Sequence, residues 1–128
     1  MSARKKYTFI DLFAGCGGLS EGFLQTGNYE GLAHIEWELP MVKTLRQRLI
    51  ERWKHSEEDA IKRVIKFDVQ KTTVLFYGNW SEETKKLYET DNHPLIVKKG
   101  LDGLIGKKQV DLIIGGPPCQ AYSIAGRA

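Results

Sequence analysis

The chain has 128 residues, of which 41% are hydrophobic and 27% are charged, enough for one modest core and one domain. Its formal net charge of +3 fits an ordinary protein as well as one with a polyanionic partner. No apolar run approaches the roughly 18 residues that span a bilayer, and no signal peptide is evident, so we expect an intracellular, cytoplasmic protein without membrane contact.

The first 53 residues predict two strand–helix units. The segment 7–13 is rich in strand formers and runs through a glycine turn into a helical pattern at 19–25. A second strand is expected at 31–36. After Pro40, apolar residues recur at helical spacing over 41–53, which predicts the second helix.

The middle of the chain continues the alternation less clearly. Residues 56–63 are charged and predict a helix or a loop, and 64–69 predict a third strand. We expect 72–108 to be a helical insertion, in which Ser81 caps a helix with an acidic first turn.

A fourth strand is predicted at 110–114, where a nearly continuous apolar run is typical of a strand buried on both faces of a parallel sheet. Strands that alternate with helices predict an α/β fold with a doubly wound sheet, which binds ligands at the carboxyl ends of its strands. The glycine turn at 15–18, Glu36, Asp68 and Cys119 all lie at the carboxyl ends of predicted strands.

The glycine turn predicts a nucleoside site. Gly15, Gly17 and Gly18 let a ligand approach the backbone, and Glu36, about 20 residues later, can accept hydrogen bonds from ribose hydroxyls. A tight turn without a ligand is the structural alternative. A nicotinamide dinucleotide is weakly supported, because its fingerprint requires a third glycine where this chain has Ser20.

Two further residues complete the predicted pocket. Trp37 can lay its indole against an adenine, and Asp68 can accept a hydrogen bond from the adenine amino group. Their structural alternatives are packing for Trp37 and a helix or turn cap for Asp68.

Of the two cysteines, Cys119 is the candidate nucleophile, because Pro117 and Pro118 rigidify the backbone just before it at the end of a predicted strand. We interpret Cys16 as an inert, buried small hydrophobe.

The remaining polar residues predict no further site. A solvated helix face is the expected role of four basic residues, Arg46, Arg48, Arg52 and Lys54. The three histidines, His34, His55 and His93, are expected to be structural or exposed, and no metal site is predicted.

Two stretches, FIDLFAGCGG at 9–18 and DLIIGGPPCQAYS at 111–123, closely resemble the first and fourth signature motifs of cytosine-C5 DNA methyltransferases. Glu36-Trp37 and Asp68-Val69 resemble the second and third motifs. The resemblance covers nearly the whole chain except about 72–108. It implies the Rossmann-like, doubly wound sheet of S-adenosylmethionine-dependent methyltransferases, incomplete in this chain.

The resemblance also implies the site and its ligands. The cofactor would be S-adenosyl-L-methionine, bound by Asp11, Phe13, Ala14, Gly15, Cys16, Gly17, Gly18, Glu36, Trp37, Asp68, Val69 and Pro118. Cys119 would add to cytosine C6 of a base flipped out of double-stranded DNA. Gln120, Ser123 and Arg127 would contact the DNA backbone.

The later motifs of the family and its target-recognition region are absent, so we interpret 1–128 as the N-terminal part of a catalytic domain that is inactive alone. We expect a bacterial, DNA-associated enzyme of restriction-modification type. An uncovered sheet would require self-association or a complementary C-terminal subunit. The alternatives are a non-catalytic module that binds a cofactor or partner and an RNA cytosine methyltransferase.

Overall fold

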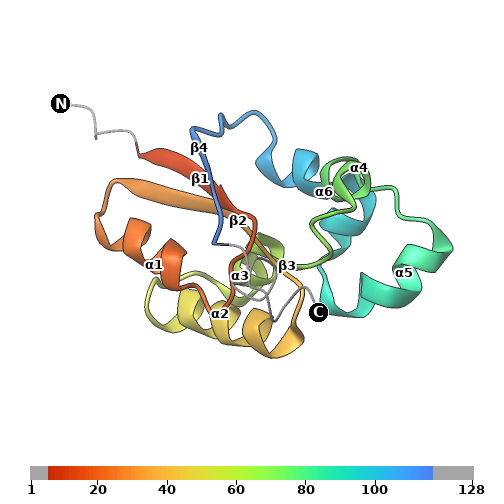
Figure 1. The fold of residues 1–128 in the computed structure, drawn as a ribbon, viewed down its shortest axis with the longest axis horizontal. Coiled ribbons are helices and arrows are strands. Elements are labelled where there is room, and N and C mark those ends of the chain that lie inside the picture. Colours follow the sequence, from red (N-terminus) through yellow and green to blue (C-terminus); the bar gives the residue numbers. More distant parts are fainter. Residues whose placement is uncertain (1–5, 117–128) are drawn as a thin grey trace, which may run out of the picture.

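A computed structural model describes residues 6–116 and shows a four-stranded parallel sheet with helices on both sides (Figure 1). The strands are β1 (Tyr7–Asp11), β2 (Tyr29–Glu36), β3 (Val64–Lys66) and β4 (Leu112–Ile114). Their order in the sheet is β3-β2-β1-β4, so the chain changes direction after β3 and adds β4 on the free side of β1. This order confirms the expected α/β fold and places a ligand-binding switch point beside β1.

Every connection between strands contains at least one helix. The helices are α1 (Gly18–Gln25), α2 (Leu39–Glu51), α3 (Glu57–Arg63), α4 (Thr72–Tyr77), α5 (Glu82–Tyr88), the 3-10 turn η1 (Glu89–Asp91) and α6 (Pro94–Ile105). The expected helical insertion is confirmed, and the Ser81 side chain accepts a hydrogen bond from the backbone N–H of Thr84 as the α5 cap. Within residues 6–116, no helix has the length and apolar character needed to cross a membrane.

Two apolar clusters hold the helices against the sheet. On one face, Ile10, Ile35 and Ile65 pack with residues of α4 and α6 such as Leu75 and Leu101. The second cluster joins α2 and α3 to the sheet and consists of Ala14, Val42, Leu45, Leu49, Ala60 and Val64. Each fully buried valine, leucine or isoleucine side chain in these clusters stabilises the fold by roughly 1.5–3 kcal/mol. In Figure 1, α1 and α2 lie apart from the group formed by α4, α5 and α6.

A bulge in β2 sets which side chains face each other. Phe9 pairs with Gly31, but the next residue of β1, Ile10, pairs with Ala33, so Leu32 is the extra residue. Asp11 therefore lies opposite His34 rather than opposite Ala33. Because side chains alternate between the two faces of a strand, this one-residue shift places Asp11 and His34 on the same face.

The outer edge of β3 is sealed by side chains. The Asn92 amide accepts a hydrogen bond from the N–H of Lys66 at 3.0 Å and donates one to the C=O of Lys66 at 2.9 Å, as a neighbouring strand would. The Arg46 guanidinium donates to the C=O groups of Val64 and Asp91, both at 2.7 Å. The expected solvated role of Arg46 is therefore wrong, because its charged end is used to satisfy the backbone of an edge strand.

The opposite edge of the described sheet is formed by β4, and here the expectation of a strand buried on both faces is wrong. Among the described residues, β4 pairs only with β1, and the Ile113 side chain is 57% exposed. Its apolar sequence is that of an interior strand. Within residues 6–116, however, no further strand pairs with its outer edge.

Candidate functional site

A cavity of about 590 Å³ lies at the carboxyl ends of β1, β2 and β3. It is lined by Leu12, Phe13, Ile35, Glu36, Trp37, Glu38, Met41, Phe67, Asp68, Val69 and Gln70. The volume is typical of a small-molecule site, and the lining is mostly apolar with a few carboxylates. The fold therefore brings Phe13, Glu36, Trp37, Asp68 and Val69, predicted from separate motifs, to one place.

Glu36 is held at the cavity by backbone N–H groups from two segments. Gly15 N donates to Oε1 at 3.1 Å, and Glu38 N donates to Oε2 at 2.5 Å. A carboxylate oxygen has two lone-pair directions, so each oxygen keeps one acceptor position for a ligand. The carboxylate is thus oriented in advance, which reduces the entropy lost when it binds a pair of hydroxyls.

The glycine turn at 15–18 supports the site through its backbone conformation. Gly15 and Gly17 have φ angles of +58° and +97°, in the left-handed region that favours glycine. A Cβ on Gly17 would lie 2.5 Å from Leu45 Cδ1, so the turn also needs glycine for close packing on α2. Ala14 is buried, and its N–H donates to Ile35 O at 2.9 Å. Gly18 is the first residue of α1. Of this motif, Gly15 has the observed link to the cavity, through Glu36.

Aromatic and acidic residues supply the rest of the wall. Phe13 is 36% and Trp37 62% exposed, so Trp37 is not a core packing residue. Such exposed rings can stack on a planar ligand. Asp68 Oδ1 accepts a hydrogen bond from Gln70 N at 2.9 Å, which is the turn-capping role that was the alternative for this residue. The same residue lines the cavity, so the two roles coexist.

Asp11 belongs to a buried network that sequence reasoning missed. It does not line the cavity. Its Oδ2 accepts from Ser20 Oγ at 2.7 Å and its Oδ1 from Phe13 N at 3.2 Å, and Ser20 Oγ lies 2.9 Å from His34 Nδ1. Burial raises the pKa of Asp11 against the opposing effect of these hydrogen bonds, and burial lowers the pKa of His34 to about 3. The available signal was Ser20, at the position where a dinucleotide fingerprint has its third glycine.

The structure describes one of the two cysteines, Cys16. Cys16 is exposed, so the interpretation of it as a buried hydrophobe is wrong, because the left-handed turn at Gly15 and Gly17 leaves its side chain at the surface. Cys16 is also not among the residues that line the cavity. Five predicted residues lie outside the described residues: Pro118, Cys119, Gln120, Ser123 and Arg127.

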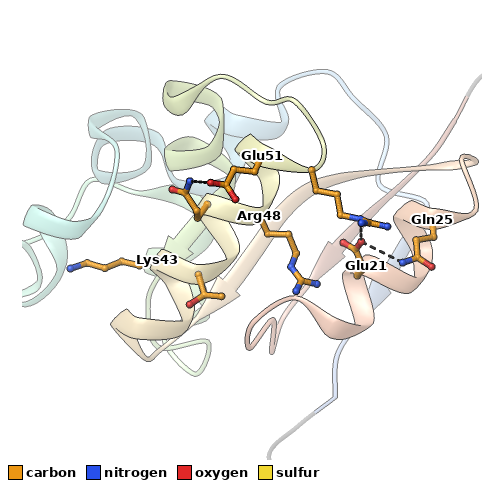
Figure 2. A pocket seen from close by; sticks show the side chains of 8 residues that line it. Glu21, Gln25, Lys43, Arg48 and Glu51 are labelled. Carbon is orange, nitrogen blue, oxygen red and sulfur yellow. Dashed lines mark hydrogen bonds and ion pairs between the residues drawn. The ribbon is translucent and has the colours of Figure 1, made fainter.

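A second hollow of about 710 Å³ lies between α1 and α2, away from the strand ends (Figure 2). Its side chains are largely engaged with each other: Arg52 pairs with Glu21 at 2.6 Å, and Gln47 donates to Glu51 at 2.6 Å. The Arg52 side chain is 58% exposed, as expected for a solvated helix face, and it also pairs with Glu21. This larger hollow contains none of the predicted site residues, so we assign the candidate site to the cavity at the strand ends.

The comparisons with known proteins agree with this geometry. The model of the family described as C-5 cytosine-specific DNA methylase matches residues 7–79 and 65–128, which together span most of the chain. This chain belongs to that family. The matched ranges include the glycine turn, Glu36, Asp68 and the segment around Cys119.

Several curated relatives cover nearly all of this methylase-family chain. It is 31% identical to "Type II methyltransferase M.Bpa9945I" of Bacillus paralicheniformis over 93% of the chain and 32% of that relative. It is 32% identical to "Putative type II methyltransferase M.MjaORF1200P" of Methanocaldococcus jannaschii over 90% of the chain and 36% of that relative. The chain thus spans about a third of the length of these relatives. No solved structure matches it.

Proposed function

We propose that this chain is the cofactor-binding and nucleophile-bearing part of a DNA cytosine-C5 methyltransferase. The observation that carries the proposal is the Glu36 carboxylate, held by the N–H groups of Gly15 and Glu38 at a cavity of cofactor size. The relatives named as cytosine-5 methyltransferases support the reaction, for example "DNA (cytosine-5-)-methyltransferase M.ApeKI" of Aeropyrum pernix, 31% identical over 93% of this chain and 20% of that relative.

The residues present fit S-adenosyl-L-methionine. The two free acceptor positions of Glu36 suit the two ribose hydroxyls, and the exposed rings of Phe13 and Trp37 suit the adenine face. Asp68 keeps a carboxylate oxygen beside the one that accepts from Gln70 N, and this oxygen suits the adenine amino group. Val69 adds apolar wall.

When bound, S-adenosyl-L-methionine supplies an electrophilic methyl group on a sulfonium sulfur. Cytosine C5 is a weak nucleophile, so we assign to Cys119 the addition of its thiolate at C6, which makes C5 electron-rich. The chemistry that the bound cofactor would supply is transfer of this methyl group to C5, with the electron pair of the broken S–CH₃ bond staying on sulfur. Loss of the C5 proton to a base and departure of the thiolate from C6 restore the aromatic ring.

The DNA contacts are assigned by the resemblance. We place double-stranded DNA at the segment that follows Cys119, where Gln120, Ser123 and Arg127 would hold the backbone of a duplex whose target base is flipped out. Pro118 would border the cofactor. In the complete enzyme, Cys119→Ala should abolish methyl transfer while cofactor binding persists. Retained turnover would refute the assignment of the nucleophile.

The open β4 edge favours a second candidate function for the chain by itself, that of a binding module. Ile113 is exposed on a strand that pairs on one side among the described residues, and the chain spans about a third of its relatives. We infer that methyl transfer requires further strands beside β4, supplied by a complementary C-terminal segment or subunit, with self-association as the alternative. Methylation of DNA by the 128-residue chain alone would contradict this inference.

Calorimetric titration of S-adenosyl-L-methionine into the purified chain tests the proposed cofactor site. Glu36→Ala should weaken binding by about 10- to 100-fold, because charge-assisted hydrogen bonds contribute roughly 1.5–3 kcal/mol. Glu51→Ala is the matched control, since Glu51 lies on α2 outside the cavity and should leave the Kd unchanged. Absence of binding by a folded wild-type chain, or equal binding by Glu36→Ala, would refute the cofactor assignment.

A further inference from the structure

Three side chains from three elements form a buried chain of hydrogen bonds behind the cavity. Asp11 ends β1, Ser20 lies in the first turn of α1, and His34 lies in β2. All three are almost completely buried, with exposed fractions of 0%, 0% and 1%. Because buried polar groups are costly unless they are paired, each donor in this network needs an acceptor.

With Asp11 as a carboxylate, which can only accept, the proton count fixes the direction of this network. The Ser20 hydroxyl has one proton, and it donates this proton to Asp11 Oδ2 at 2.7 Å. The 2.9 Å contact between Ser20 Oγ and His34 Nδ1 therefore requires His34 to be the donor. With its pKa lowered to about 3 by burial, His34 is neutral near pH 7 and carries one ring proton, which must be on Nδ1.

The far end of the network reaches the cavity. Asp11 Oδ1 accepts from the backbone N–H of Phe13 at 3.2 Å, and Phe13 lines the cavity. The Phe13 ring also packs closely on Gly115, where an added Cβ would lie 3.0 Å from Cδ2 of the ring. The ring position thus depends on where the Asp11 carboxylate holds the Phe13 backbone.

We propose that Ser20 and His34 are positioning residues that fix Phe13 at the cofactor cavity through Asp11. The purpose of this positioning rests on the proposed function, in which Phe13 forms the part of the cavity wall that contacts the adenosyl group. The hydrogen bonds from His34 and Ser20 through Asp11 to Phe13 do not depend on any ligand. Neither residue lines the cavity itself, so both act through Asp11 and the Phe13 backbone.

The ligand-free chain provides the first test, by nitrogen-15 NMR. Neutral His34 should carry its proton on Nδ1, and Ser20→Ala should accelerate amide exchange at Phe13 by about tenfold, the loss expected for one charge-assisted hydrogen bond. Ser81→Ala is the control: it removes a hydroxyl that caps α5, and it should leave Phe13 exchange unchanged. A proton on Nε2, or equal exchange in both variants, would overturn the network.

Calorimetry with S-adenosyl-L-methionine then tests the purpose of the network. Ser20→Ala should raise the Kd by roughly three- to tenfold, while Ser81→Ala should match wild type. An unchanged Kd in Ser20→Ala, with wild-type binding intact, would overturn the positioning role. A folded wild-type chain that does not bind would instead refute the proposed function, and the NMR measurements would still decide the network.

Discussion

Lowering the pH from 7 to 5 should destabilise the protein through His34. The unfolded chain binds a proton on this residue below its ordinary pKa of 6.5, whereas the buried ring in the folded state stays neutral until about pH 3. Below pH 6.5 the unfolded state therefore holds more protons, and stability falls as the pH falls. With 1.36 kcal/mol per pKa unit, His34 alone lowers the free energy of unfolding by about 2 kcal/mol between pH 7 and pH 5.

Urea denaturation followed by circular dichroism at the two pH values measures this loss. His34→Asn should lose about 2 kcal/mol less than wild type on acidification, although it is less stable at pH 7. His93→Asn is the matched control, because His93 is partly exposed, caps α6 by accepting from Leu95 N, and is replaced by a good cap.

Asp11 acts in the opposite direction. Its raised pKa contributes stability that is lost as the pH rises from 3.8 through the folded-state value. Asp11 is present in all three chains, so its direct contribution largely cancels in the comparison. If His34→Asn lost stability as steeply as wild type, the assignment of His34 as a buried neutral group would be refuted.

Further predictions concern the glycine turn and the sealed edge. Gly17→Ala should cost roughly 1–3 kcal/mol, because alanine would be forced into a left-handed conformation against Leu45. The same change at Gly22, in open space on α1, should instead stabilise by about 0.5–1 kcal/mol, and thermal unfolding separates the two; equal signs would contradict the reasoning. Asn92→Ala should cost about 2–3 kcal/mol in urea unfolding, because both backbone groups of Lys66 lose their partner; a loss below about 0.5 kcal/mol would show that the edge is not sealed this way.

The sequence predicted the arrangement of elements well because its patterns are local. The glycine turn, the helical spacing after Pro40 and the Ser81 cap each depend on residues within one or two turns of each other, and the structure confirms all three. The third and fourth strands are shorter than predicted, at three residues each. Backbone pairing of β3 ends at Lys66, before the apolar pattern does, and pairing of β4 begins only at Leu112, after the apolar pattern has started.

The features that were missed depend on contacts between distant segments. No local sequence pattern predicts the bulge at Leu32, yet this bulge places His34 opposite Asp11. In the sequence, Arg46 cannot be distinguished from other basic residues on the helix. Only the fold brings the carbonyl groups of Val64 in β3 and Asp91 in η1 beside its guanidinium. The motif residues of the cavity were predictable because each lies at or just after the end of a strand, whereas the hydrogen bonds of Asp11, Ser20 and His34 behind them were not.

The sealed edge of β3 gives the segment 72–108 a role in limiting assembly. With Asn92 and Arg46 in place, β3 presents no free ladder to another chain, so β4 is the edge left for association among the described strands. Two copies that joined through β4 would form a closed pair. If the segment 72–108 were shortened so that the backbone groups of β3 lost their partners, each copy would have two different unpaired strand edges, β3 and β4. Pairing of β3 in one copy with β4 in the next would then produce open-ended polymers.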